Sequence, residues 1–475
     1  MPSRLPIDRS VSVTLTREDQ FPTTAGFNTA LMLTPTPLVG FLDATHRTLL
    51  YSNIFEVGLQ WPAASQEYKA AALFFSAKVR PPQIKFGWYD PSKDMTDEMN
   101  AIYQADPDWF WLLATNVLND TAKQRAIADW SETHEVIFGA DSNDTDTEVP
   151  GAVDDVTFQA TISQGSPAVL TKTAHGLTND QQVRLTTSGT LPAPLTATDT
   201  YFVVNASANT FNLSATQGGT AIATTTAGSG THTVTSPRFG GSIAEYVENK
   251  AYDHTAVFYH TDPGSYLAAA AWAYACGRDF DRANYARAAA GFIDSGQAYT
   301  LKFKTLPGVE PINRPSATIQ AVTGFVPGIG INRDQGHSAN TYVNMGGRNM
   351  LLEGTVGSGA FIDTIHFSAW IRARTQESVF GVLSNAAVVP YTNQGTAFLI
   401  EAGVHPPLRR AFAAGLIAPQ FGDDGEFVPE FQTAVDDVAN IPVAQRRNRI
   451  APDIQVQFLT AGAIHFASVS MTLKF

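Results

Sequence analysis

The sequence has one cysteine, few charged residues and no long apolar run, and each shortage excludes a class of protein. Cys276 has no cysteine to pair with, which excludes an intramolecular disulfide and a cysteine-based zinc finger. No run of about 18 apolar residues is present, and the first residues lack the apolar segment of a secretory signal peptide. We therefore expect a soluble protein with no membrane insertion.

The charge of the chain argues against contact with nucleic acid. Charged residues make up 16% of the 475 residues, whereas a typical soluble protein has about 25%, and the net charge is −13. Because phosphate binding requires concentrated lysine and arginine, we expect no direct nucleic-acid partner. Much of the surface must instead consist of uncharged polar residues and glycine, which is unusual for a free cytosolic enzyme.

The sequence contains no motif that predicts catalysis or cofactor binding. No Walker A sequence is present, and the glycine-rich residues 324–330 lack dinucleotide spacing. His134 and Glu135 lack the second histidine of a zinc hydrolase, while Asp141, Asp144 and Asp146 lack the glycine and glutamate of a calcium loop. The sequence therefore predicts no enzyme activity, no cofactor and no metal site.

Composition changes between residues 156 and 236, which predicts a separate module. These 81 residues contain twenty threonines and only four charged side chains. Short β-rich segments alternate there with turn residues at hairpin spacing, which is typical of a small all-β barrel or sandwich. An acidic connector at 141–155 precedes the module and residues 237–241 follow it, so we expect an insertion into a host domain.

The host alternates strand and helix patterns, which predicts an α/β layer with the insertion at the edge of its sheet. Further strands are expected at 299–303 and in a hairpin around Gly346 and Gly347, followed by a long amphipathic helix. A second helical stretch contains His405-Pro406-Pro407, where proline predicts a kink or break. The strands expected before residue 299 are 83–88, 109–114, 135–138 and 255–259, and the helices expected along the chain are 96–104, 121–133, 243–249, 265–276, 362–384 and 395–414.

Both ends of the chain alternate apolar and polar residues with a period of two, which predicts a strand at each end. Terminal strands need partners for their backbone groups, and strands of neighbouring chains can supply them by augmentation. The residues on the apolar faces, our candidates for inter-subunit strand arms, are Val11, Val13, Leu15, Val469, Met471, Leu473 and Phe475.

Arg446, Arg447 and Arg449 form the densest basic cluster of an acidic chain. They precede a hairpin that we expect over residues 454–475. The cluster is interpreted either as a solvated loop or as an electrostatic contact with an acidic partner surface.

Three segments in the last third of the sequence, 299–309, 414–419 and 449–465, resemble the tail sheath proteins of contractile-tailed bacteriophages, in a branch formerly catalogued only as phage proteins of unknown function. Residues 25–33 are similar to the start of that family, and the inserted module resembles β-rich repeats of phage structural proteins. The resemblance implies an α+β fold, with mixed α/β sheath core domains, an inserted small all-β domain and terminal strands exchanged between subunits. The implied domains are an N-terminal strand arm (1–20), an α/β sheath domain (21–150 and 238–298), a β-rich decoration domain (151–237) and a C-terminal sheath domain with a terminal strand arm (299–475).

This resemblance implies a structural subunit of the virion tail that is assembled in the cytoplasm of the host bacterium. Copies of the chain would form a helical stack of hexameric rings around a tail tube protein, with the three arginines facing the tube. The stack would also contact baseplate and tail terminator or neck proteins, and its contraction would drive the tube through the host envelope for genome delivery.

Two alternatives remain open at this point. The chain is a tail tube or baseplate structural protein in the first, although a tube subunit needs little more than one small barrel. In the second it is a tail-associated glycan hydrolase, which would require two carboxylates about 5 to 10 Å apart in a cleft.

Overall fold

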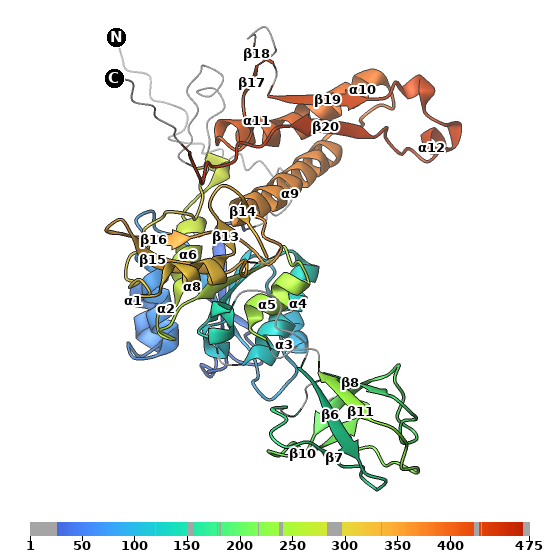
Figure 1. The fold of residues 1–475 in the computed structure, drawn as a ribbon. Helices are drawn as coiled ribbons and strands as arrows, with labels where there is room; N and C mark the ends of the chain where they lie inside the picture. The colour runs from blue at the N-terminus through green and yellow to red at the C-terminus, as the bar shows by residue number, and fades with distance from the viewer. Residues whose placement is uncertain are drawn as a thin grey trace, which may run out of the picture.

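The protein consists of a mixed α/β body, a β-barrel and a C-terminal arm. In this computed structural model the barrel lies at one end of the body and the arm leaves from the other (Figure 1). We call residues 26–149 and 241–361 the body, residues 156–236 the barrel and residues 362–468 the arm. No helix among the described residues is long and apolar enough to cross a bilayer. The structure describes residues 26–118, 120–149, 156–177, 179, 182–216, 218–236, 241–282, 297–333, 335–421, 427, 428 and 430–468.

An eight-stranded sheet forms the centre of the body, in the order β16-β15-β12-β5-β4-β1-β3-β2. The six strands from β15 to β3 run parallel, and the two edge strands run antiparallel to their neighbours. Every residue of β1, β4 and β12 is buried, as expected for parallel strands covered on both faces. The strands are β1 (Thr29–Thr34), β2 (Thr48–Tyr51), β3 (Gln83–Trp88), β4 (Trp111–Leu113), β5 (Ile137–Ser142), β12 (Thr255–Tyr259), β15 (Asn340–Met345) and β16 (Arg348–Leu352).

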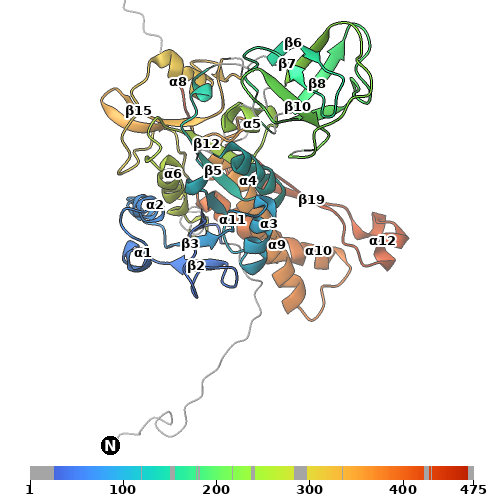
Figure 2. The same cartoon turned by 90° about the horizontal axis from the view of Figure 1, so that it is seen from below.

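Helices cover both faces of this sheet, and in Figure 2 β5 lies between α6 and α4. Asp94, Asp120 and Ser242 begin three of the helices by accepting backbone N–H groups of the first turn, which otherwise lack partners. The predicted helices and their alternation with strands are thus confirmed in the body. One face carries α3 (Met95–Ala105), α4 (Thr121–His134), α5 (Ile243–Asn249) and α8 (Ser316–Thr323), and the other carries α2 (Gln66–Phe75), with α1 (Ile54–Gln60) packed on it, and α6 (Leu267–Cys276).

The barrel confirms the predicted all-β insertion. Its six strands close in the order β10-β7-β6-β11-β8-β9 around an apolar core that includes Leu170, Leu185 and Val203. The insertion follows β5, which lies between β4 and β12, so the expected position at the edge of the sheet is wrong. The edge strands of the sheet are β16 and β2. The barrel strands are β6 (Val156–Ile162), β7 (Leu170–Thr171), β8 (Gln182–Thr187), β9 (Thr200–Val204), β10 (Thr210–Ser214) and β11 (His232–Ser236).

The segment after residue 297 differs from the prediction in two ways. Residues 299–303 form turns rather than a strand, and Phe303 has a left-handed backbone (φ 66°) that ends any extended conformation. The hairpin of β15 and β16 is confirmed, with Gly346 and Gly347 in its turn at positive φ. Because this hairpin completes the central sheet, a boundary at residue 299 would divide one sheet between two domains.

The arm begins with a helical layer. It contains α9 (Ile362–Asn385), α10 (Asn393–Leu399), a π-helical turn (Ile400–Val404) and α11 (His405–Ala413). The prolines after His405 lie in the first turn of α11, and the backbone is helical on both sides of them, so the chain does not break there. The expected irregularity is present as the π-helical turn just before them.

An antiparallel ribbon of β19 (Phe431–Val435) and β20 (Ile454–Phe458) lies on these helices, and α12 (Val443–Arg447) connects its strands. The partner of β20 is therefore β19, and the expected hairpin over 454–475 is wrong for the described part of that range. Residues 459–461 instead run beside residues 416–418, with Ala418 N donating to Leu459 O at 2.8 Å. The shorter elements are β13 (Phe325–Val326), β14 (Gly330–Ile331), β17 (Gln420–Phe421), β18 (Phe427–Val428) and the 3-10 turns Thr115–Val117, Thr145–Glu148, Phe280–Arg282 and Val438–Asn440.

Candidate assembly surfaces

The β19–β20 ribbon has two open edges. It contains only two strands, and in the described part of the chain no other strand pairs with the outer side of either. One face of the ribbon carries Phe431, Val456 and Phe458, which pack against the main apolar core, and Phe458 contacts Phe367 of α9. The helices thus hold the ribbon flat while its edge N–H and C=O groups stay available to a further strand.

Exposed apolar side chains are concentrated in the arm. The described residues expose twenty large apolar side chains, and ten of them belong to residues 362–468. Clusters of exposed apolar side chains mark interaction surfaces in soluble proteins. The ten residues of the arm are Phe380, Leu383, Val388, Phe398, Val435, Val443, Ile450, Leu459, Ile464 and Phe466.

A groove of about 770 Å³ separates α9 from α10. Val382 of α9, Ala386 just after it and Phe398 of α10 form apolar walls, and Asp281 and Arg374 lie at its polar end. The groove therefore has an apolar wall and a polar end, and it is a candidate binding surface for part of a neighbouring chain.

Asp281 is the centre of the ion network that joins the body to the arm. Arg374 of α9 donates to it at 2.7 Å, Arg410 of α11 at 3.0 Å and Trp370 Nε1 at 3.3 Å. Desolvation alone would raise the pKa of Asp281, but the hydrogen bonds and charge of Arg374 outweigh it and hold that pKa below its ordinary value. The carboxylate is thus ionised and holds both arm helices on the body.

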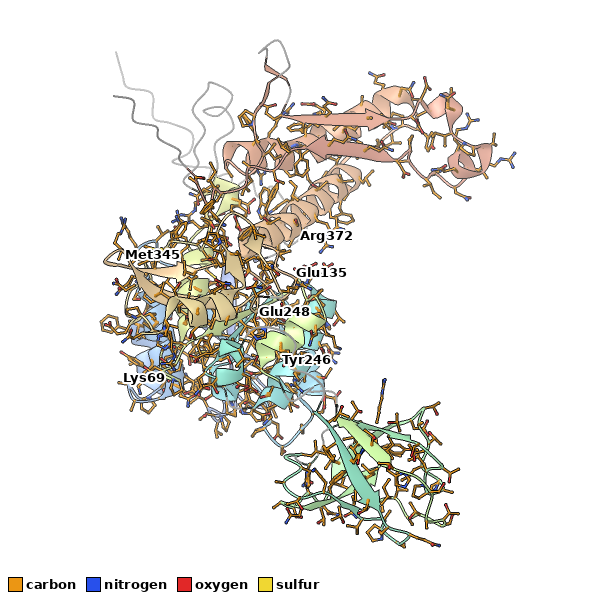
Figure 3. The ribbon with its side chains drawn as sticks, in the orientation of Figure 1. Lys69, Glu135, Tyr246, Glu248, Met345 and Arg372 are labelled. Atoms are coloured by element: carbon orange, nitrogen blue, oxygen red, sulfur yellow. The ribbon has the colours of Figure 1, made fainter. Side chains whose placement is uncertain are left out.

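A second contact of this kind joins α4 to α9. Figure 3 shows Arg372 and Glu135 pointing toward each other from these two elements, and the guanidinium binds both carboxylate oxygens. Glu135 has a left-handed backbone at the end of α4 (φ 56°), which turns its side chain toward α9. Both side chains are about half exposed, so the pair contributes little stability and mainly orients the arm. The sequence gives no local indication of it, because the residues are 237 positions apart.

The three arginines of the basic cluster lie far out on the arm. Arg446 and Arg447 end α12, and Arg449 follows with a left-handed backbone (φ 58°). All three are exposed, and none forms an ion pair with another described residue. The candidate strand-arm residues, Val11, Val13 and Leu15 at one end and Val469, Met471, Leu473 and Phe475 at the other, lie outside the described residues.

Two residues of types that often take part in catalysis, Cys276 and Asp141, lie inside the body. Cys276 is buried, and desolvation raises the pKa of its thiol well above the ordinary value. Asp141 accepts the backbone N–H of Ala268 at 2.8 Å, and desolvation raises its pKa to about 7. Within the described ranges no three His, Cys, Asp or Glu residues are grouped so as to hold a metal ion.

Comparison with known proteins finds a family match for the arm. Residues 362–473, which begin with α9, match the family described as E217 tail sheath protein gp31-like, C-terminal domain. Comparison with curated protein sequences finds no match.

Solved structures extend the likeness to the whole chain. The chain is similar to one in the cryo-EM structure of the anti-feeding prophage baseplate, 6-fold symmetrised, with a TM-score of 0.50, 10% identity, and coverage of 98% of this chain and 99% of that one. The same baseplate in its contracted state has a similar chain, with a TM-score of 0.51, 11% identity and 99% coverage of both chains. A chain of the anti-feeding prophage helical sheath in its contracted state has a TM-score of 0.48, 11% identity, and coverage of 98% and 99%.

At these identities the two baseplate likenesses show a shared fold, and the family match shows what the arm is similar to. The resemblance found in the sequence is thereby confirmed: the chain resembles the tail sheath proteins of contractile tails, and its residues 362–473 match the model of the E217 gp31-like C-terminal sheath domain.

Proposed function

We propose that the chain is a structural subunit of a bacteriophage contractile tail sheath. The observation that carries this proposal is that the family match coincides with the arm, which has open strand edges and half of the exposed large apolar side chains among the described residues. A full-length likeness of fold to contractile-tail baseplate chains supports the same role. The family also supports a structural rather than an enzymatic role, with no cofactor.

In this proposal the arm joins neighbouring subunits by strand augmentation. The outer edges of β19 and β20 accept the terminal strands of adjacent copies, formed by residues 10–16 and 468–475. A contact between two different surfaces of the same protein does not close on itself, so it propagates as a helical polymer. Stacked sixfold rings are one such arrangement.

Contraction then requires two arrangements of the same subunits that differ in their contacts. A sheath assembled in the less stable arrangement contracts without nucleotide, because the difference in contact free energy supplies the work. The ion pairs of Asp281 and Arg372 hold the arm to the body, so the subunit moves largely as one unit while its contacts with neighbours change.

The proposal also includes partners other than the chain itself. We propose that Arg446, Arg447 and Arg449, at the end of the arm, face an acidic surface of the tail tube. Baseplate and terminator proteins cover the two ends of the stack, where strand edges would otherwise remain open. The assembled sheath belongs to the virion tail and forms in the host cytoplasm.

A second candidate is a baseplate component, because two of the similar structures are of a baseplate. Electron microscopy of the purified full-length protein separates the possibilities. Wide hollow sleeves that lengthen with concentration support the sheath subunit, whereas single rings of limited size support the baseplate component. Narrow tubes or single particles at all concentrations would contradict the proposed function.

A further inference from the structure

Lys302 and Glu353 form an ion pair inside the body. Each side chain is only 2% exposed, and Lys302 Nζ is in direct contact with Glu353 Oε2. The two residues are 51 positions apart. Their segments are joined by a backbone hydrogen bond from Phe303 N to Leu351 O. Gly354 follows Glu353, and a Cβ there would lie 3.0 Å from Leu301 Cβ, so glycine allows the two segments to approach closely.

The surroundings of the pair are apolar. The ring of Phe325 lies over Lys302 Nζ at 3.5 Å from its centroid, and the ring of Phe303 lies at 5.2 Å. Among the described residues Glu353 is the only acceptor for the ammonium group, and no third charged side chain forms an ion pair with either partner. Taking two charges out of water is costly, and their mutual attraction does not always repay the cost.

Burial shifts both groups toward their neutral forms. Desolvation lowers the pKa of Lys302 and raises that of Glu353, although each partner opposes the shift of the other. Transfer of one proton from the ammonium to the carboxylate therefore gives a neutral amine beside a neutral carboxylic acid. A desolvated lysine amine is a nucleophile, and fixed proximity replaces a bimolecular encounter.

We propose that Lys302 and Glu353 form an intramolecular amide bond, an ε-(γ-glutamyl)lysine cross-link. The lone pair of Nζ attacks Cδ of the protonated Glu353 carboxyl group and forms the C–N bond. The C–OH bond then breaks, and the hydroxyl leaves as water with one of the two protons of the amine. Atoms and charge balance without an oxidant, reductant or further reactant, and the reaction removes both charges from the buried site.

The cross-link would lie at the root of the arm. Glu353 is located between β16 and α9, and the turn that contains Lys302 pairs with β16 through Phe303 N and Leu351 O at 2.8 Å. A covalent bond here would close the chain between residues 302 and 353 and fix the start of the arm to the sheet. The inference rests on the pair itself and does not depend on the proposed function.

Mass spectrometry of the unfolded full-length protein tests the proposal. The expected mass is about 18 Da below that of the sequence, because one water is lost. Trypsin does not cleave after an acylated lysine, so the digest should contain residues 288–304 covalently joined to residues 349–372. Lys302→Met should restore the full mass, whereas Lys304→Met, a change of the neighbouring lysine, should keep the loss.

The mass and the peptides of the wild-type protein test the cross-link independently of the variants. Full mass together with separate linear peptides would show that Lys302 and Glu353 form an ion pair only, and would overturn the proposal. A loss of mass that persists in Lys302→Met would assign the missing water to another site and would overturn it equally.

Discussion

The barrel and the arm both extend from the body, and their strand edges differ. Every barrel strand is paired on both sides, whereas the β19–β20 ribbon of the arm has open edges. The barrel closes six strands on themselves, and none of the exposed large apolar side chains of the described chain lies between residues 156 and 236. The arm leaves two strands open and exposes ten such side chains. A closed barrel needs no partner, whereas an open ribbon with apolar surroundings is incomplete alone. The comparison predicts that assembly depends on the arm and not on the barrel.

Deletion of the terminal strands should have the largest effect. Removal of residues 1–16 or 468–475 should abolish polymerisation, because the open edges of the arm would lose the strands proposed to cover them. Sedimentation and electron microscopy would then show folded monomers. As a matched control, Ser12→Gln with Thr14→Gln changes the polar face of the strand proposed at residues 10–16 and should preserve assembly. Normal sleeves from either truncation would show that this end takes no part in the contact.

As pH is lowered, α9 at the start of the arm should lose stability at a higher pH than the barrel does. Burial among aromatic rings lowers the pKa of His366 to about 3. Between pH 6.5 and 3 the unfolded chain therefore binds a proton that the folded chain does not, so this stability is complete above pH 6.5 and falls as pH falls. The loss is on the order of 5 kcal/mol across the window.

Hydrogen exchange of α9 at a series of pH values measures this effect, with the barrel strands as the internal reference. His366→Phe should flatten the profile of α9, and His46→Phe, a change at an exposed site, should leave it unchanged. Equal acid sensitivity of the barrel and α9 would argue against His366 as the cause.

Asp281→Asn should loosen the arm from the body. The substitution removes the charge that binds Arg374 and Arg410, and because Asp281 is partly exposed we expect a loss of about 1–2 kcal/mol in unfolding free energy. Asp279→Asn is the matched control, because Asp279 pairs with the exposed Arg282. Denaturant unfolding of both variants checks the difference, and equal stabilities would remove the special role of Asp281.

The arginine cluster should affect contact with the tube and not the fold. Changing Arg446, Arg447 and Arg449 together to Gln should leave the unfolding temperature unchanged but reduce assembly around purified tube several-fold. Added salt should have the same effect on the wild type, since partly exposed ion pairs are worth about 0.2 to 1 kcal/mol each and are screened. Normal sheathing by the triple variant would exclude these residues from the tube contact.

Removal of the barrel should have the smallest effect on assembly. A short Gly-Ser bridge in place of residues 156–236 should leave polymerisation within about twofold of the wild type, because adjacent strands β6 and β11 bring the ends of the insertion together. Sedimentation at matched concentrations measures this. Loss of sleeves in a variant that still folds would reverse the comparison between barrel and arm.

Elements with a strong local pattern were predicted well. The helix at 243–249 and the strand at 255–259 coincide with the prediction, and α4 begins at the predicted residue, with Asp120 as its cap. The strand expected at 299–303 failed because Lys302 is buried toward Glu353 and Phe303 turns the chain. The partner of β20 was missed because β19 is short and carries a weak pattern, so its pairing depends on the helices beneath it.

The sequence by itself determined the parts that depend on neighbours along the chain: the α/β alternation, the closed insertion, the long helix and the family resemblance of the last third. Hydrophobic periodicity and capping act over a few residues, so they can be recognised without the fold. Only the tertiary structure decided the contacts between distant segments. Asp281 and Arg374, or Lys302 and Glu353, become partners because packing places them together, and burial then gives each pair its chemistry.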